Sequence, residues 1–321
     1  MSSHGFIGQD AAWREWRMAL ASDRLHHAWL LAGPKGLGKR EFAQAAAASL
    51  VGASGYPANH PDVLILSNLP KDDKEARKKA DGEAYETKRN ISVDQIRMMQ
   101  QRLTVRPTLG DKRAIIVDSA DDLEKSAVNA LLKSLEEPPA STVFLLVSHQ
   151  PGRLLPTVRS RCRVLRFAQL GADEIDAVLR RDMPDADPAF RAAAIEAAQG
   201  SPGIALSFVA HKLTALHRMM QRIVREGDPD FTLRGAMADE IGARPPRERM
   251  AATLDLARME MAAALRSADR ARQARIIEAH AALTRLSAQA PTYNFDPGLL
   301  VMEIGGLLAS AAMPRETANR A

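Results

Sequence analysis

The chain has 321 residues, which is more than one hydrophobic core usually supports, so a single compact domain is excluded in favour of two or three. Its 46% hydrophobic and 26% charged residues are an ordinary globular composition, and a net charge of +5 fits either a nucleic-acid partner or a solvated basic surface. The single cysteine, Cys162, excludes an internal disulfide and a cysteine zinc cluster. The first nine residues lack a signal-peptide layout, and no apolar run approaches the roughly 20 residues that span a bilayer, so we expect a cytoplasmic protein.

Five short apolar runs in the first half are typical of buried parallel strands. They cover residues 28–32, 63–66, 114–117, 142–147 and 164–167. Patterns typical of helices lie between them, at residues 41–50, 93–102 and 126–135. Because strands alternate with helices, we predict an α/β domain whose parallel sheet is covered on both faces.

The remaining segments are charged or helical in pattern. Residues 71–90 have many charges and almost no large apolar residues, so we expect a surface excursion that does not fold by itself. After residue 167 strand-like runs vanish, and periodic segments predict helices at residues 172–181, 188–198 and 204–224. The predicted domains are therefore an α/β domain at 1–168, a small helical domain at 169–216 and a helical bundle at 217–321.

A glycine-rich segment at residues 33–39 follows the first predicted strand and precedes a predicted helix, which is the context of a phosphate-binding loop. Gly33, Gly36 and Gly38 allow the backbone to wrap around an anion with its N–H groups pointing inward. Lys39 would reach the terminal phosphates of a nucleotide, and the helix N-terminus adds partial positive charge. The alternative is a glycine-rich turn without a ligand.

Two positions depart from what magnesium-dependent hydrolysis requires. Arg40 stands where a Ser or Thr hydroxyl normally binds magnesium. Asp118, at the end of a predicted strand, is the expected acid on the metal side, but Ser119 replaces the Glu that would activate the attacking water. Asp121 and Asp122 are nearby, and we expect them to cap a helix or to be solvated. We therefore expect no hydrolysis of ATP, while binding of ATP or ADP without turnover stays open.

Several segments resemble the clamp-loader group of the AAA+ ATPases. Residues 126–139 resemble the stretch that this group carries between its acidic box and the next strand. Ser148 stands at the place of the polar residue that senses the terminal phosphate, and residues 160–162 resemble the Ser-Arg-Cys motif. Residues 5–9 resemble the opening box that borders the adenine pocket. The resemblance also extends to residues 91–97 and 293–297 and is strongest over residues 23–167.

The resemblance implies a P-loop AAA+ domain, a small helical lid domain and a C-terminal helical collar domain through which five subunits form a ring. It implies a non-hydrolysing stator subunit whose partners are the gamma/tau motor subunits and the delta subunit, and, through the complex, the sliding clamp and primer–template DNA. Arg161 would then enter the ATP site of a neighbouring motor subunit as an arginine finger. From the residues alone, Arg161 could equally be a salt-bridged surface residue, and Cys162 is expected to pack rather than to react.

Two other functions are considered. An active AAA+ ATPase, such as a clamp-loader motor subunit or a recombination-associated relative, would carry a hydroxyl after Lys39 and Glu at position 119. A free-standing nucleic-acid-binding protein would need a strong basic patch or an aromatic surface, yet aromatic residues make up only 4%. We expect no metal, because residues 51–62 lack the four cysteines with which many relatives bind zinc, and His26 and His27 have no further ligand nearby.

Overall fold

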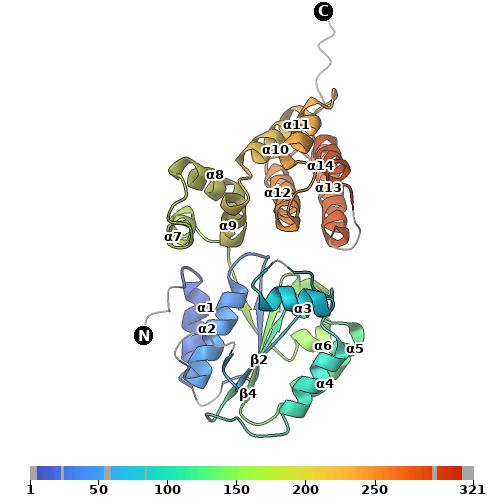
Figure 1. Cartoon of the computed structure of the whole chain (residues 1–321). Helices are drawn as coiled ribbons and strands as arrows, with labels where there is room; N and C mark the ends of the chain where they lie inside the picture. The colour runs from blue at the N-terminus through green and yellow to red at the C-terminus, as the bar shows by residue number, and fades with distance from the viewer. Residues whose placement is uncertain (1–5, 23–24, 54–58, 84, 291–294, 313–321) are drawn as a thin grey trace, which may run out of the picture. The chain divides into compact units, whose positions relative to one another are not determined.

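The computed structural model describes residues 6–22, 25–53, 59–83, 85–290 and 295–312 (Figure 1). The chain divides into two compact units, Met1–Ala168 and Gln169–Ala321. The further division that the sequence predicts at residue 216 falls inside helix α10 (Thr214–Glu226) and stays a prediction. None of the helices in the described ranges combines the length and the apolar character needed to cross a bilayer.

The first unit contains a sheet of five strands that are all parallel. They are β1 (Ala28–Ala32), β2 (Val63–Ser67), β3 (Arg113–Asp118), β4 (Thr142–Ser148) and β5 (Arg163–Arg166), in the order β2-β3-β4-β1-β5. The predicted α/β fold with a parallel sheet is therefore confirmed. Because the register pairs Ala32 with Ser148, the residues that follow β1 and β4 emerge at the same edge of the sheet. In open α/β sheets, ligands bind outside this carboxyl edge.

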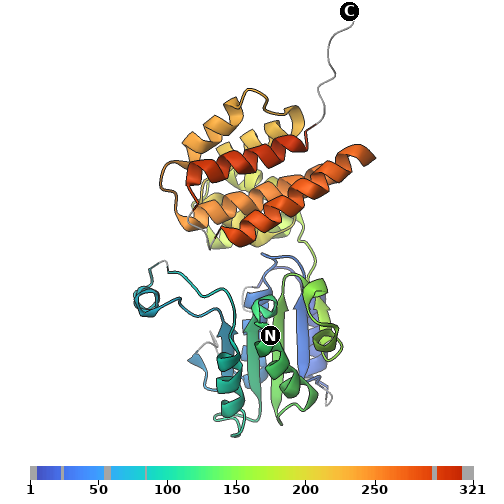
Figure 2. The same cartoon turned by 90° about the vertical axis from the view of Figure 1, so that its right-hand side faces the viewer.

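Helices cover both faces of the sheet (Figures 1 and 2). They are α1 (Asp10–Leu20), α2 (Lys39–Val51), α4 (Val93–Arg102), α5 (Lys125–Glu136) and the short α6 (Pro156–Arg159), with single turns η2 (Ala120–Asp122) and η3 (Pro151–Arg153). Trp29 and Leu31 of β1 pack into the cluster with α1 and α2, whereas Leu30 packs into the cluster with α4 and α5. The central strands β1, β3 and β4 are buried on both faces, which explains their nearly continuous apolar runs. The edge strands are less buried: β2 is mostly half-buried, and three of the four residues of β5 are exposed.

The charged excursion contains a helix, α3 (Asp73–Ala80), that the sequence did not predict. Figure 2 shows this helix standing clear of the sheet. Asp72 caps it by accepting a hydrogen bond from the Glu75 backbone N–H at 2.9 Å. The Glu75 carboxylate is buried and accepts from the Glu86 N–H at 2.6 Å and from Lys78 Nζ at 2.7 Å. The prediction failed because it considered only apolar burial, whereas polar contacts hold this helix.

The second unit is helical. Its helices are α7 (Ala172–Asp182), α8 (Pro188–Ala198), α9 (Pro202–Ala210), α10, α11 (Thr232–Ile241), α12 (Arg247–Leu265), α13 (Arg270–Gln289) and α14 (Pro297–Ser310). The helix predicted at residues 204–224 is two helices, because the chain ends α9 in a Schellman motif. Lys212 takes the left-handed conformation, with φ of 53°, and the Leu213 N–H donates to the Phe208 carbonyl at 3.1 Å. The left-handed residue is not glycine, so the sequence hides this break.

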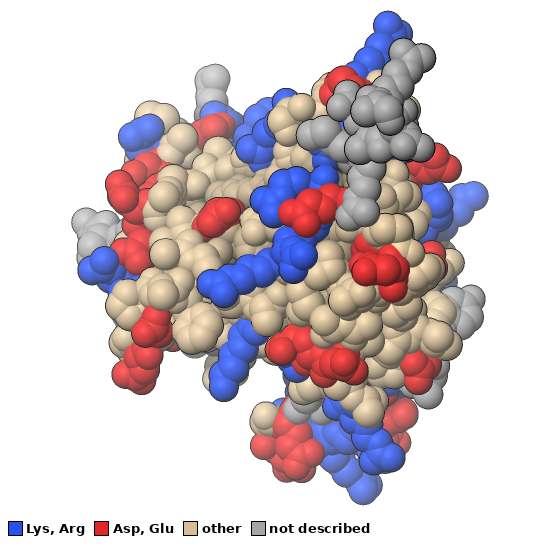
Figure 3. Space-filling view, turned by 90° about the horizontal axis from the view of Figure 1, so that it is seen from above, with Lys and Arg blue, Asp and Glu red and all other residues tan. Residues whose placement is uncertain are grey.

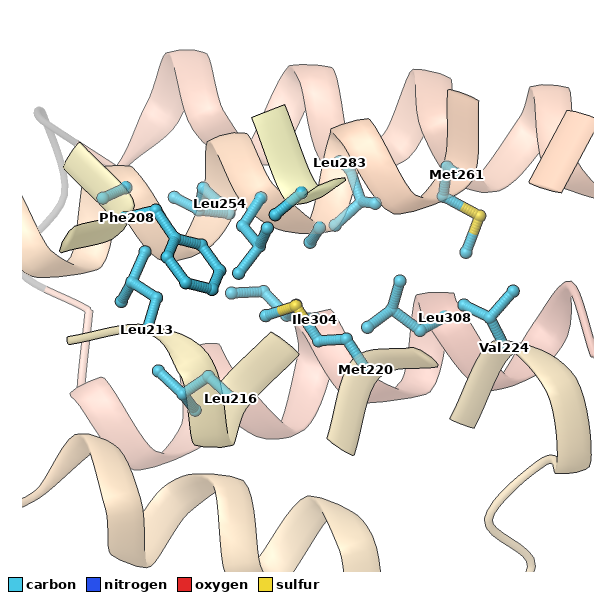
Figure 4. Close-up of a cluster of buried hydrophobic side chains, with 14 of the residues drawn as sticks. Phe208, Leu213, Leu216, Met220, Val224, Leu254, Met261, Leu283, Ile304 and Leu308 are labelled. Carbon is cyan, nitrogen blue, oxygen red and sulfur yellow. The ribbon is translucent and has the colours of Figure 1, made fainter. Parts of the chain in front are cut away.

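One hydrophobic cluster joins the helices of the second unit, and Figure 4 shows Phe208, Met220 and Leu283 from three of them facing one another. A buried arginine completes the packing. Arg272 Nε donates to the carbonyl that follows α14, at Ala311, over 2.9 Å, and its Nη2 donates to Val224 near the end of α10 over 3.0 Å. These bonds satisfy carbonyl groups that have no partner within their own helices.

Candidate functional site

The glycine-rich loop lies between β1 and α2, at the carboxyl edge of the sheet. Gly36 and Gly38 have φ angles of 83° and 78°, which favour glycine. A Cβ atom on Gly38 would lie 3.0 Å from Cζ of Phe6. A Cβ atom on Gly33 would lie 2.7 Å from the carbonyl oxygen of Phe167. The fold therefore requires glycine at Gly33 and Gly38, while the binding of phosphate by this loop stays a prediction.

Lys39 is buried at the start of α2 and is held by the loop itself. Its Nζ donates to the carbonyl oxygen of Gly33 at 2.7 Å and to that of Pro34 at 2.5 Å. Burial lowers the pKa of Lys39 to about 8, although the charges of Asp121 and Asp118 oppose the shift. The ammonium group therefore remains mostly protonated at pH 7, and it brings a positive charge to the centre of the loop.

Arg40 and Asp118 form an ion pair in the structure. Arg40 Nε lies 3.3 Å from Asp118 Oδ2, with the arginine half-exposed and the carboxylate largely buried. Burial raises the pKa of Asp118, and the guanidinium opposes that shift. The carboxylate predicted to face a metal thus faces a cationic side chain of its own chain. The residues present do not fit a magnesium ion, because position 40 offers no hydroxyl and its guanidinium would repel the ion.

The Asp121 carboxylate, from the turn η2, contacts the residues at the end of β4, so the expectation that it caps a helix or is solvated is wrong. Its carboxylate accepts from Ser148 Oγ at 2.8 Å, from the His149 backbone N–H at 2.5 Å and from the Gln150 N–H at 3.3 Å. Ser148 is fully buried, and this contact fixes its hydroxyl. Asp121 and Ser148 are 27 residues apart, so no local pattern in the sequence indicates this contact. Asp122 accepts instead from Asn68 Nδ2 at 3.3 Å.

His149 is a further residue of the site that the sequence analysis missed. Burial lowers its pKa to about 4, and the charges of Lys39 and Lys35 add to the effect. The imidazole is therefore neutral at pH 7, and the positive charge around it comes from Lys39 and Lys35.

Arg161 follows α6 and lies apart from the loop. Its Nη2 is 2.6 Å from Glu136 Oε1 at the end of α5, and its Nη1 donates to the Thr157 carbonyl at 2.8 Å. None of the hydrogen bonds and ion pairs found within the described ranges joins Arg161 to the loop. The carboxyl edge of the sheet thus brings together most of the predicted site residues, namely Gly33, Gly36, Gly38, Lys39, Arg40, Asp118 and Ser148. Arg161 instead contacts Glu136 and Thr157, and its role stays a prediction.

Cys162 is not suited to act as a nucleophile. Burial raises the pKa of its thiol to about 12, which keeps the thiol neutral at pH 7. The rings of His26 and His27 stack at 4.6 Å, and the part of the chain that the structure describes contains no cluster of three or more residues suited to a metal. Gly5 of the opening box and residues 293–294 lie outside the described residues.

Comparison with known proteins decides the family. Residues 8–171, just over half of the 321, match the family model described as "DNA polymerase III, delta subunit". The chain belongs to this family. Among curated proteins, DNA polymerase III subunit delta' of Pseudomonas aeruginosa is 37% identical over 174 residues, which are 50% of this chain and 48% of that protein. The sequence motifs predicted a member of the clamp-loader group, and this similarity to delta' confirms that prediction.

Two further matches concern related subunits. DNA polymerase III subunit gamma/tau of Mycobacterium bovis is 32% identical over 207 residues, 63% of this chain and 35% of that protein. The chain thus spans half or less of the length of the curated relatives that it matches. The crystal structure of a DNA polymerase III gamma subunit-related protein from Thermotoga maritima covers 93% of this chain and 98% of that one, with a TM-score of 0.51 and 17% identity. This similarity supports the fold described above for this chain, an α/β domain followed by helices.

Proposed function

We propose that this chain is the delta-prime, or stator, subunit of a DNA polymerase III clamp loader. It forms a ring with gamma/tau motor subunits and the delta subunit, and it supports loading of the sliding clamp onto primed DNA. It does not hydrolyse ATP, so it contributes to the polymerase holoenzyme without an ATPase activity of its own. The ion pair between Arg40 and Asp118 is the observation that carries the non-hydrolysing role.

Hydrolysis requires a metal-bound triphosphate and a group that activates water. The Arg40 guanidinium lies against Asp118, which is the carboxylate that would face the metal. Ser119 follows Asp118, and a serine hydroxyl is a poor base at neutral pH. The site keeps the glycine geometry and the lysine of a phosphate-binding loop, so nucleotide binding without turnover is compatible with it.

Arg161 is proposed to act in the site of a neighbouring motor subunit. Its side chain is 32% exposed, and the Thr157 carbonyl anchors one of its nitrogens. A guanidinium offers five N–H donors in a fixed fork, and the Thr157 carbonyl uses one of them, so donors remain for phosphate oxygens when Nη2 leaves Glu136. An arginine supplied in trans to phosphoryl transfer accelerates the reaction by about 10³- to 10⁵-fold.

The alternatives receive less support. The similarity to gamma/tau subunits keeps an active ATPase under consideration, but the chain lacks the hydroxyl at position 40 and the glutamate at position 119 that hydrolysis requires. A free-standing nucleic-acid-binding protein would need a surface of one charge. On the face drawn in Figure 3, groups of Lys and Arg side chains lie beside groups of Asp and Glu side chains.

The isolated chain is therefore expected to show no magnesium-dependent ATP hydrolysis. A steady-state phosphate-release assay with purified protein should give the same background rate for the wild type, for Lys39→Ala and for wild type in excess EDTA. A purified gamma/tau motor subunit is the positive control. Magnesium-dependent turnover that Lys39→Ala abolishes would show an active ATPase and contradict the proposal.

A further inference from the structure

We propose that Glu136 holds Arg161 in a resting position and competes for its guanidinium with the phosphate of the neighbouring subunit. This inference rests on the proposed function of Arg161. Glu136 is the last residue of α5, and Arg161 follows α6, so the contact joins two helices that are separate in sequence. The carboxylate oxygen Oε1 lies 2.6 Å from Nη2.

Two contacts hold the guanidinium, and they differ in charge. The Thr157 carbonyl accepts from Nη1 at 2.8 Å and leaves the positive charge of Arg161 unchanged. Glu136 brings a full negative charge, which cancels the charge of Arg161 at short range. An arginine finger acts by offering positive charge to the phosphoryl oxygens. A guanidinium that remains paired with a carboxylate offers little of that charge.

Simultaneous contact of the neighbour's phosphate and Glu136 with the Arg161 guanidinium is unfavourable, because the two groups are anions and repel each other. The exposure of the two side chains shows that the exchange is feasible. Arg161 is 32% and Glu136 48% exposed, so water can solvate the carboxylate when the guanidinium leaves it. Exposed ion pairs of this kind shift an equilibrium by no more than about five-fold. Glu136 therefore restrains Arg161 without preventing its engagement by a triphosphate.

The next residue in the chain provides a matched control. Glu137 follows Glu136 directly and is also exposed. Within the described ranges, no ion pair is found for Glu137, whereas Glu136 pairs with Arg161. The variants Glu136→Gln and Glu137→Gln remove the same charge from adjacent positions. Only Glu136→Gln releases Arg161.

The first test measures ATP hydrolysis by the reconstituted complex with gamma/tau, delta, clamp and primed DNA at ATP concentrations below saturation. Glu136→Gln should raise the rate by about two- to five-fold, and Glu137→Gln should leave it unchanged. The increase should shrink at high salt, because ions screen an exposed pair, and it should vanish when Arg161 is also replaced by alanine. A fall in rate with Glu136→Gln would show that the carboxylate assists Arg161, and this result would overturn the proposal.

The second test uses the isolated chain and needs no ring. Phenylglyoxal modifies exposed arginines, and peptide mass spectrometry reads the modification of Arg161 separately from that of the other arginines. Glu136→Gln should increase the rate at Arg161 relative to wild type and Glu137→Gln. Equal rates in all three proteins would mean that Glu136 does not restrain Arg161 and would overturn the proposal by itself. A higher modification rate in Glu136→Gln would show that the resting contact exists. If Arg161→Ala nevertheless leaves the ATPase rate of the complex unchanged, the proposed finger is refuted, and so is the competition between Glu136 and the phosphate.

Discussion

Replacing Arg161 by alanine is expected to slow ATP hydrolysis at the motor-subunit site that it completes by about 10³-fold or more. Phosphoryl transfer builds negative charge on the transferring oxygens, and the guanidinium stabilises that charge when it enters the site. The fold of the first unit should not change, because the contacts of Arg161 are one exposed ion pair and one hydrogen bond to a carbonyl. The measurement is single-turnover ATP hydrolysis by the reconstituted complex with clamp and primed DNA.

Two controls separate this effect from a general loss of charge. Arg159→Ala removes an exposed arginine from the end of α6, two residues before Arg161, and it should leave the rate unchanged. Arg161→Lys keeps the charge but loses the planar fork, so it should recover only part of the rate. Equal rates of hydrolysis and clamp loading for wild type and Arg161→Ala would refute the finger.

Replacing Asp228 by alanine is expected to reduce the free energy of unfolding of the second unit by about 3–5 kcal/mol, the usual cost of removing one partner of a buried ion pair. The Asp228 side chain is 1% and that of Arg234 14% exposed, with Nε of Arg234 2.9 Å from Oδ2 of Asp228. The carboxylate also accepts from the N–H groups of Leu233 and Arg234 at 3.0 Å each. Alanine would leave the guanidinium and both N–H groups without this acceptor. Denaturant unfolding followed by circular dichroism measures the loss.

Asp230→Ala is the matched control, since Asp230 lies two residues away and is exposed. It should change the free energy of unfolding by less than about 0.5 kcal/mol, as is usual for surface substitutions. Equal stability of the two variants would contradict the importance of the Asp228 contacts.

The same pair predicts a dependence on pH. Burial raises the pKa of Asp228, but the Leu233 N–H and Arg234 outweigh burial, so the folded-state pKa lies below its ordinary value. A carboxylate with a depressed folded-state pKa stabilises the fold above the unfolded-state value, about 4, and this contribution disappears as the pH falls through the folded-state pKa. The difference in stability between wild type and Asp228→Ala should therefore shrink as the pH is lowered below about 4.

The sequence predicts the elements that apolar patterns define. The central strands β1, β3 and β4 are predictable because both of their faces are buried, which makes each of them a nearly continuous apolar run. The loop is predictable for a different reason: a Cβ atom on Gly33 would clash with the Phe167 carbonyl, and Gly38 has a positive φ, so both positions retain glycine. The order of the strands then brings Asp118 and Ser148 to the carboxyl edge beside the loop, as the motif spacing indicated.

Contacts between residues far apart in sequence are what the sequence could not predict. Asp121 binds the end of β4 and fixes Ser148, although a run of two aspartates before a helix suggested a cap. Glu136 is part of the segment that carries the family resemblance, yet nothing in that segment indicated its contact with Arg161. A local break was also unpredictable: after α9, Lys212 takes a conformation that usually belongs to glycine, and the pattern gave no sign of it.

The structure also changes the interpretation of the proposed nucleotide site. The sequence showed two separate departures from a hydrolysing site, Arg40 and Ser119. The ion pair shows that Arg40 also engages Asp118, the acidic residue that was retained. Restoring Ser119 to glutamate alone would therefore leave the metal side of the site blocked by a guanidinium.

The most direct test of the account is native mass spectrometry of a mixture of the purified chain with gamma/tau and delta subunits. The account predicts a complex that contains this chain together with both kinds of subunit and that forms equally well with Arg161→Ala, because the collar rather than the finger is proposed to hold the ring. If gamma/tau and delta assemble while this chain remains monomeric, the chain is not a clamp-loader subunit, and the proposed function is contradicted.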